Sequence, residues 1–306
     1  MATFTGYDGN EYTILTSKTC KLITYNGTIG GKIKIDYVYN NTTNARYSVT
    51  EIDSGDSSDY IFQNFADNII LFEVEFPLVT TIGDYAFYKC YALTSAHFPK
   101  AITIGDYAFE ECYALTSAHF PKATTIGIEA FKYCYALTSV YFPLVTTIGD
   151  YAFYECYTLT SAHFPKATII GIEGFEYCYA LTSVYFPLAT TIGDYAFYEC
   201  YTLQEVSIPS LPSSADNTTI FELSPNITHV YIGNIYLAST YASNLGLNIS
   251  VFKQYCPPKP YCDKLKILVP YSVGVLITCG YIYNRMQKSH ISSKIKKHKH
   301  KFSLKE

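Results

Sequence analysis

The chain has 306 residues, 49% of them hydrophobic and 16% charged, so it can bury a substantial core and has the composition of an ordered protein. The apolar share is unusual in kind, because it includes 32 Tyr and 19 Phe but no Trp. Residues 284–306 hold eight basic residues and one acidic residue, whereas residues 1–283 hold 14 basic and 25 acidic residues. An acidic body argues against nucleic-acid binding, and a short basic tail points to anionic lipid or the cytosolic side of a membrane.

Residues 1–54 precede any repeat, and we expect them to form an N-terminal β cap. The start, MATFTGYDGNEYTIL, has no basic stretch followed by an apolar run, so it predicts no ordinary signal peptide. Residues 55–76 are predicted to form a divergent first coil of the array that follows. Their apolar positions lie 22 residues before equivalent positions in the regular repeat, namely Phe65, Leu71, Val74 and Phe76.

Six regular coils of 22 residues occupy residues 77–208, where Pro, Ile-Gly, Phe, Cys-Tyr and Leu recur at fixed places. Residues 121–164 and 165–208 are identical at 35 of 44 positions, which indicates a recent duplication of a two-coil unit. Twenty-two residues are too few for paired helices but lie within the range of leucine-rich repeats. We therefore predict an α/β solenoid, in which a coil buries its apolar face only by stacking on its neighbours.

Each coil has a half that predicts a strand and a half that predicts a short helix. In the first regular coil, Leu93, Ala96 and Phe98 follow the pattern L-x-x-L-x-L, and alternation sends Ala96 and Phe98 inward. In the other half, IGDYAFYKC places apolar residues on one face of a short helix, which Asp84 can cap. The inward residues expected there are Ala86, Phe87 and Cys90.

One cysteine recurs in every regular coil, and three chemistries could explain it: disulfides, a metal ladder or a packed core. Equivalent cysteines would stand about 4.8 Å apart, but parallel Cβ directions disfavour disulfides between them. Zinc ligands usually come as close C-x-x-C pairs, which are missing here. We therefore predict a structural ladder of buried, reduced thiols at Cys90, Cys112, Cys134, Cys156, Cys178 and Cys200.

Strand alternation also turns two rows of residues outward, and these rows are the candidate binding face. The first row is predicted to contain His97, His119, Tyr141, His163 and Tyr185, and the second Ser95, Ser117, Ser139, Ser161 and Ser183. Rigid rings beside small hydroxyls suit a contact surface, although identical residues can equally just stack on one another. His97 and His119 lack a third metal ligand in register, so we predict no metal site.

A second aromatic row follows the cysteines, from Tyr91 to Tyr201, and its simplest explanation is also self-stacking. Catalysis has little support, because neither a His/Ser/Asp constellation nor a glycine-rich phosphate loop is evident. We predict that the protein is not an enzyme and uses no cofactor.

The repeat LVTTIGDYAFYKCYALTSAHFP resembles the BspA-like leucine-rich repeat of surface proteins from anaerobic bacteria and mucosal parasitic protists. It departs from ordinary leucine-rich repeats as that subfamily does, with the Cys before the strand. Residues 20–35 look like the hairpin that opens such arrays, and residues 229–249 look like the usual closing segment. The resemblance implies surface display, adhesion or host contact, and it brings no catalytic residues.

After the regular coils, residues 209–232 are predicted to form a last coil with a two-residue insertion, so that eight strands stack in parallel. Residues 233–262 are expected to form a C-terminal cap, in which Cys256 and Cys262 bracket PPKPY and could form a loop disulfide.

Residues 267–283 are 17 residues without a charge, at the lower limit for a transmembrane segment. The basic tail at 284–306 agrees with the positive-inside rule, so we favour a single-pass anchor with a cytosolic tail. Pro270 and the short length count against it, and packing on the last coil is the alternative. Six N-x-[ST] sequons lie outside residues 77–208, at Asn26, Asn40, Asn41, Asn217, Asn226 and Asn248.

Two functions remain open. The first is a cell-surface protein whose solenoid face binds host or extracellular-matrix proteins or other surface proteins. The second is a cytoplasmic scaffold with the same fold.

Overall fold

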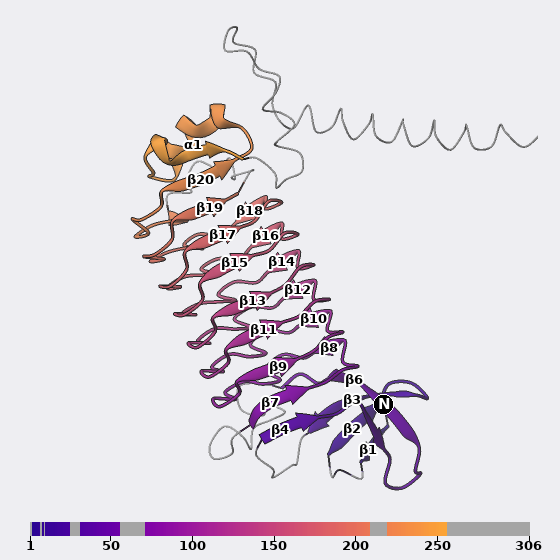
Figure 1. The fold of residues 1–306 in the computed structure, drawn as a ribbon. Coiled ribbons are helices and arrows are strands. Elements are labelled where there is room, and N and C mark those ends of the chain that lie inside the picture. The colour runs from indigo at the N-terminus through magenta and orange to yellow at the C-terminus, as the bar shows by residue number, and fades with distance from the viewer. Residues whose placement is uncertain are drawn as a thin grey trace, which may run out of the picture.

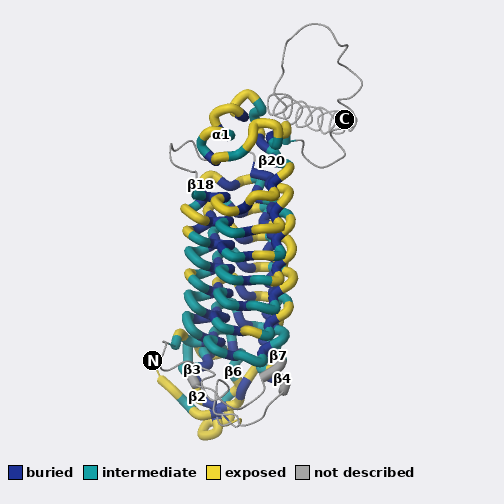
Figure 2. The backbone as a smooth tube through the Cα atoms, turned by 90° about the vertical axis from the view of Figure 1, so that its left-hand side faces the viewer, coloured by how far each residue is buried: buried dark blue, intermediate teal, exposed yellow. Residues whose placement is uncertain are grey.

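The computed structural model describes residues 2–6, 8, 10–24, 31–55, 71–208 and 219–255. The chain winds into a solenoid of stacked coils, each about 22 residues long (Figure 1). The same positions are buried in coil after coil along the stack (Figure 2). Several features predicted from the sequence lie outside the described residues: Phe65, the disulfide Cys256–Cys262, the segment 267–283 and the basic tail 284–306.

The eight predicted parallel strands form one side of the solenoid. They pair in register, so that His97 faces His119 and His119 faces Tyr141. The fourth and fifth strands, β13 and β15, share no ladder, so this side consists of two five-stranded sheets that β4 (Gly31–Lys34) and β21 (Phe252–Gln254) complete at the two ends. The eight strands are β7 (Leu71–Glu75), β9 (Ser95–His97), β11 (Ser117–His119), β13 (Ser139–Tyr141), β15 (Ser161–His163), β17 (Ser183–Tyr185), β19 (Glu205–Ser207) and β20 (His229–Ile232).

A further sheet, which the repeat pattern did not predict, runs along another side of the coils. Each coil contributes a two-residue strand that ends on the Ile of its Ile-Gly pair, and this Ile is buried. Short strands suffice because each pairs with equivalent residues one period away. These strands are β8 (Thr81–Ile82), β10 (Thr103–Ile104), β12 (Thr125–Ile126), β14 (Thr147–Ile148), β16 (Ile169–Ile170) and β18 (Thr191–Ile192).

The N-terminal strands extend both sides of the solenoid. β4 pairs with β7, and β6 pairs with β8, so residues 31–52 already form a layer of the stack. The expected hairpin over residues 20–35 is wrong, because β3 and β4 belong to different sheets. β4 pairs in parallel with β7 of the first coil, whereas β3 pairs in parallel with β6. The remaining N-terminal strands are β1 (Thr3–Thr5), β2 (Glu11–Ile14), β3 (Thr19–Thr24), β5 (Tyr37–Tyr39) and β6 (Arg46–Ile52).

The predicted short helix of each coil is also wrong, because the structure has consecutive turns there. Tyr85 and Lys89 have φ angles of 56° and 59°, which a right-handed helix excludes. The N–H groups of Tyr85, Phe87 and Lys89 instead donate to carbonyl oxygens of the next coil. Stacking thus supplies the hydrogen bonds that a helix would make within itself. The inward positions were nevertheless predicted correctly, since Phe87 and Cys90 are buried.

Asp84 caps a neighbouring coil rather than a helix of its own. Its Oδ1 accepts the backbone N–H of Asp106 at 2.8 Å, and Asp106 does the same for Ile128 at 2.7 Å. A carboxylate at this position therefore bonds to the equivalent residue 22 positions later. The coils that carry Ile128 or Ile172 receive this bond and do not pass it on.

Two interlocking columns of phenylalanine fill the core. One column comes from the strands, with ring centroids 5.4–5.7 Å apart, and contains Phe76, Phe98, Phe120, Phe142, Phe164 and Phe186. The other comes from the turns, at 5.0–5.4 Å, and contains Phe87, Phe109, Phe131, Phe153, Phe175, Phe197 and Phe221. Edge-to-face contacts join the columns, so the core is continuous from coil to coil.

The six repeat cysteines are buried, and none of the six forms a disulfide. From the second regular coil onward, each thiol lies 3.2–3.3 Å from a phenylalanine carbonyl oxygen of the preceding coil and donates to it. Burial raises the pKa of the Cys134 thiol well above its ordinary value, which disfavours the reactive thiolate. The ladder is therefore part of the core.

The C-terminal end closes with short helices before the final strand. These are η3 (Ile235–Leu237), α1 (Ala238–Asn244) and η4 (Ile249–Val251), which follow the last coil (Figure 1). Ala238 and Tyr241 of α1 are buried, as is Leu245 directly after it. None of the helices in the described ranges is long and apolar enough to cross a membrane.

Candidate functional site

The outward rows of the parallel strands form what we call the sheet face. It brings together His97, His119, Tyr141, His163 and Tyr185, as well as the row of serines. Every residue of both rows is exposed or partly exposed. Because the backbone ladder fixes these side chains in register, the face is a preorganised array of rings and hydroxyls.

Adjacent rings of the sheet face stack in two pairs. His119 and Tyr141 lie 4.7 Å apart between ring centroids, and His163 and Tyr185 lie 4.5 Å apart. Tyr141 keeps 50% of its surface exposed, so the stacking leaves one face and the edge of this ring accessible. The two pairs flank the break between β13 and β15.

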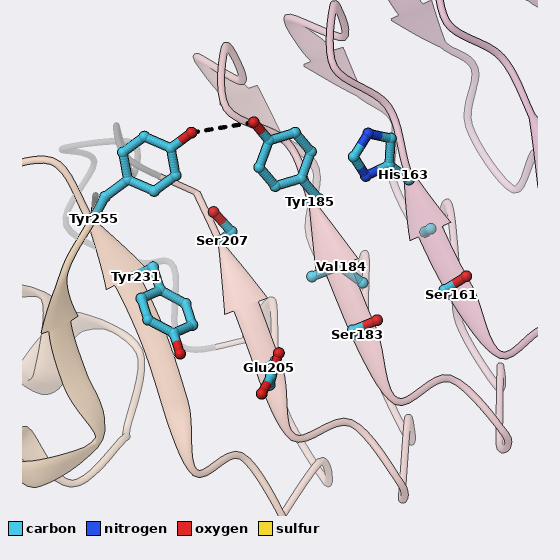
Figure 3. A pocket seen from close by; sticks show the side chains of 10 residues that line it. Ser161, His163, Ser183, Val184, Tyr185, Glu205, Ser207, Tyr231 and Tyr255 are labelled. Carbon is cyan, nitrogen blue, oxygen red and sulfur yellow. Dashed lines mark hydrogen bonds between the residues drawn. The ribbon is translucent and has the colours of Figure 1, made fainter. Parts of the chain in front are cut away.

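A hollow of about 540 Å³ opens at the C-terminal end of the sheet face (Figure 3). It lies where the ring row is interrupted, because Ser207 occupies the position that Tyr185 holds one coil earlier. The Tyr185 and Tyr255 hydroxyls meet at 3.1 Å across one side of Ser207, while Tyr231 and Glu205 lie on the other side (Figure 3). Burial and the bond to Tyr185 raise the pKa of Tyr255, so its hydroxyl keeps its proton at neutral pH.

Ser207 is the least satisfied polar group of this hollow. Its residue is only 9% exposed, and its Oγ has no hydrogen-bond partner among the residues that the structure describes. An unpaired buried hydroxyl is destabilising and is uncommon in folded proteins. One signal in the sequence marked this place, the loss of a ring at Ser207. No such signal marked Tyr255, which lies after the last repeat.

A second aromatic surface, the tyrosine column, lies on the turns. Its rings stack at 4.9–5.3 Å between centroids, and its members are Tyr91, Tyr113, Tyr135, Tyr157, Tyr179 and Tyr201. The Tyr113 hydroxyl donates to Glu111 at 2.6 Å. Stacking and local hydrogen bonds account for this column, which agrees with the simpler of the two explanations for the repeat.

Two buried carboxylates on the turns were not singled out from the sequence. Burial, with the neighbouring Glu129, raises the pKa of Glu110 to about 7. Burial, with the neighbouring Glu173, raises the pKa of Glu176 to about 8. Both occupy the same position of the repeat, but the other regular coils carry Tyr or Lys there, so no recurring carboxylate marked them.

Within the described parts of the chain, no group of three or more His, Cys, Asp or Glu side chains could hold a metal ion. Of the six sequons, Asn40 is buried and its side chain accepts from the N–H groups of Thr42 and Thr43. The folded protein therefore does not present Asn40 for glycosylation. Asn41, Asn226 and Asn248 are exposed, and Asn26 and Asn217 lie outside the described residues.

The stacked coils of about 22 residues, with a buried Leu and a parallel strand in each, define a leucine-rich repeat solenoid. The chain belongs to the BspA-type leucine-rich repeat family: the model of that repeat region matches residues 36–160 and 124–244, with six copies. This confirms the resemblance drawn from the repeat sequence. No curated protein matches the chain.

Several solved structures are similar to the chain at low identity. A leucine-rich repeat protein of T. pallidum is 20% identical, with a TM-score of 0.40, and the match covers 75% of this chain and 84% of that chain. A leucine-rich cell-surface protein of Faecalibacterium prausnitzii is 19% identical, with a TM-score of 0.40, covering 86% and 97% respectively. The pneumococcal vaccine antigen PcpA is 11% identical, with a TM-score of 0.39, covering 84% and 99%.

Proposed function

We propose that this protein recognises a protein partner through its sheet face and has no catalytic role. The observation that carries the proposal is the in-register exposure of His119, Tyr141 and His163 beside the serine row. Rigid aromatic side chains contribute contact area at a small cost in conformational entropy, and serines add adaptable hydrogen bonds. Interface energy usually concentrates in a few such anchors.

Host or extracellular-matrix proteins, or other surface proteins, are the partners that this proposal implies. It places the protein at the cell surface, with residues 267–283 as a single-pass anchor and the basic tail in the cytosol. Support comes from the resemblance of the repeat to surface proteins and from the charge difference between body and tail. The second candidate is an intracellular scaffold with the same fold.

The binding surface can be tested with beads coated with the full-length protein and applied to layers of mucosal epithelial cells. We expect His119→Ala combined with Tyr141→Ala to lower attachment more than tenfold, because both rings of one stacked pair are lost. Circular dichroism and the melting curve should not change, since both residues are exposed.

The matched control is Tyr113→Ala combined with Tyr135→Ala. These residues are also a stacked pair in the same two coils, 5.0 Å apart, but on the tyrosine column. Attachment should survive this change. Loss of attachment in the control alone would place the contact surface on the turns and overturn the proposal.

Location is tested separately by treating intact cells that make the protein with a protease. Rapid digestion of the solenoid supports surface display, whereas full protection until the cells are lysed supports the intracellular scaffold.

A further inference from the structure

The hollow at the end of the sheet face is a vacancy in a row of stacked rings. His163 covers one face of Tyr185 at 4.5 Å, and the next position in the row is Ser207, which has no ring. Neighbouring strands lie about 4.8 Å apart, so a missing ring leaves room for one further flat group beside Tyr185. Tyr255, from the residue after β21, and Tyr231 close the space on its far side (Figure 3).

The walls of the hollow have the chemistry of a cation site. Three tyrosines and the carboxylate of Glu205 surround Ser207, and none of the described residues that line the hollow is a lysine or an arginine. Tyrosine faces attract cations within about 6 Å of the ring centroid. Ser207 Oγ is a buried acceptor without a donor, which a ligand N–H group would supply.

We propose that this hollow binds the cationic head of a basic side chain presented by the partner, arginine in preference to lysine. A guanidinium is flat, so it stacks beside Tyr185 in the place of the missing ring. Its several N–H donors can serve Glu205 and Ser207 together, whereas an ammonium has a compact charge and no stacking face. A neutral sugar would stack as well, but it leaves the carboxylate without a counter-charge.

The test titrates the full-length protein with Nα-acetyl-arginine methylamide by isothermal calorimetry. Three other probes complete the set: the lysine analogue, the citrulline analogue and N-acetylglucosamine. Citrulline has the shape of arginine without its charge, so we expect it to bind at least tenfold more weakly than arginine. Equal binding of arginine and citrulline, or binding of the sugar alone, would overturn the proposal.

Two variants place the site. Glu205→Gln keeps the size of an exposed side chain and should weaken arginine binding at least tenfold. Ser207→Tyr restores the ring that other coils carry and should abolish binding by filling the vacancy. Should Ser207→Tyr fail to fold, Glu205→Gln still decides the question, and unchanged affinity in Glu205→Gln contradicts the proposal. Tyr113→Ala, on the tyrosine column and outside the sheet face, should leave the affinity unchanged.

This inference rests on the proposed function, because it names a group that the partner would present. The two can nevertheless fail separately. A small probe can fail to bind the hollow while the beads still attach through Tyr141. Conversely, the hollow can bind the arginine probe while the sheet-face variant attaches to the cells as well as wild type does.

Discussion

At the residue scale, burial decides how the ionisable groups behave. The repeat thiols are enclosed by the core and donate to carbonyl oxygens, so they act as small apolar groups. Glu110 differs, because its carboxyl group is buried in the same kind of turn and lies near the carboxylate of Glu129. The positive charge of Lys132 partly offsets this rise in pKa, but the Lys132 ammonium already donates a hydrogen bond to Glu129 at 2.6 Å.

The raised pKa of Glu110 predicts a pH-dependent stability. Folding raises this pKa from its ordinary value of 4.5 to about 7, so the folded state binds the proton more tightly than the unfolded state. The associated stability is therefore complete below about pH 4.5, falls as the pH rises, and is lost above about pH 7. Glu110→Gln should remove the part of the fall that Glu110 causes, which we expect to be on the order of 1–3 kcal/mol between pH 5 and 8, whereas the part that Glu176 causes remains.

Urea unfolding of wild type and Glu110→Gln at pH 5 and pH 8 measures this difference. The two proteins should agree at pH 5 and diverge at pH 8, where the variant is the more stable. Curves that fall in parallel would contradict the assignment to Glu110.

At the element scale, each coil is shaped by how closely it approaches its neighbours. The glycine of every Ile-Gly pair lies against the backbone of the preceding coil. A Cβ on Gly149 would meet the carbonyl carbon of Gly127 at 2.6 Å, closer than real contacts allow. This close approach lets the turns donate their N–H groups to the next coil, which is why no helix forms there.

Gly149→Ala should therefore be strongly destabilising, while Gly174→Ala should be tolerated. A Cβ on Gly174 meets nothing nearer than 3.2 Å, and the equivalent position in the neighbouring coils is Ala152 or Ala196. We expect Gly149→Ala to cost at least about 2 kcal/mol and Gly174→Ala to be neutral or stabilising by up to about 1 kcal/mol. Chemical denaturation compares them directly, and equal losses would show that the glycines are not needed for close stacking.

At the scale of the whole molecule, the solenoid is a one-dimensional stack whose ends have fewer contacts than its middle. Phe131 touches Phe109 and Phe153 in its own column and two rings of the other column. Phe221 closes the turn column and stacks on Phe197. Stability should therefore vary along the array although the residue type does not.

Phe131→Ala should cost about 3–5 kcal/mol, as for other buried aromatic truncations, and Phe221→Ala clearly less. The measurement is the free energy of unfolding from denaturant titration of the full-length chain, with hydrogen exchange to locate the loss. In Phe131→Ala the loss should spread to both neighbouring coils, and in Phe221→Ala it should remain at the C-terminal end. An equal cost at both positions would mean that the last coil is as well supported as a central one.

The sequence by itself determined the period of the solenoid, the parallel strands, and which residues point inward. These follow from contacts between equivalent positions 22 residues apart, such as Phe109 on Phe131, which a repeat displays directly. It also placed the outward rings, because alternation along a short strand depends on local geometry alone.

Only the tertiary structure decided the features that depend on unlike neighbours. The turns have a helix-like apolar pattern, but several of their N–H groups donate to carbonyl oxygens of the adjacent coil. The helix predicted from the local pattern therefore does not form. The expected N-terminal hairpin does not form, because β4 pairs with β7 of the first coil and β3 lies in another sheet. The hollow depends on the pairing of β20 with β21. This pairing brings Tyr255, the residue after β21, beside Tyr185, which lies 70 positions earlier in the chain. A periodic sequence specifies contacts between its own repeats, whereas contacts with a non-repeating cap have no period to reveal them.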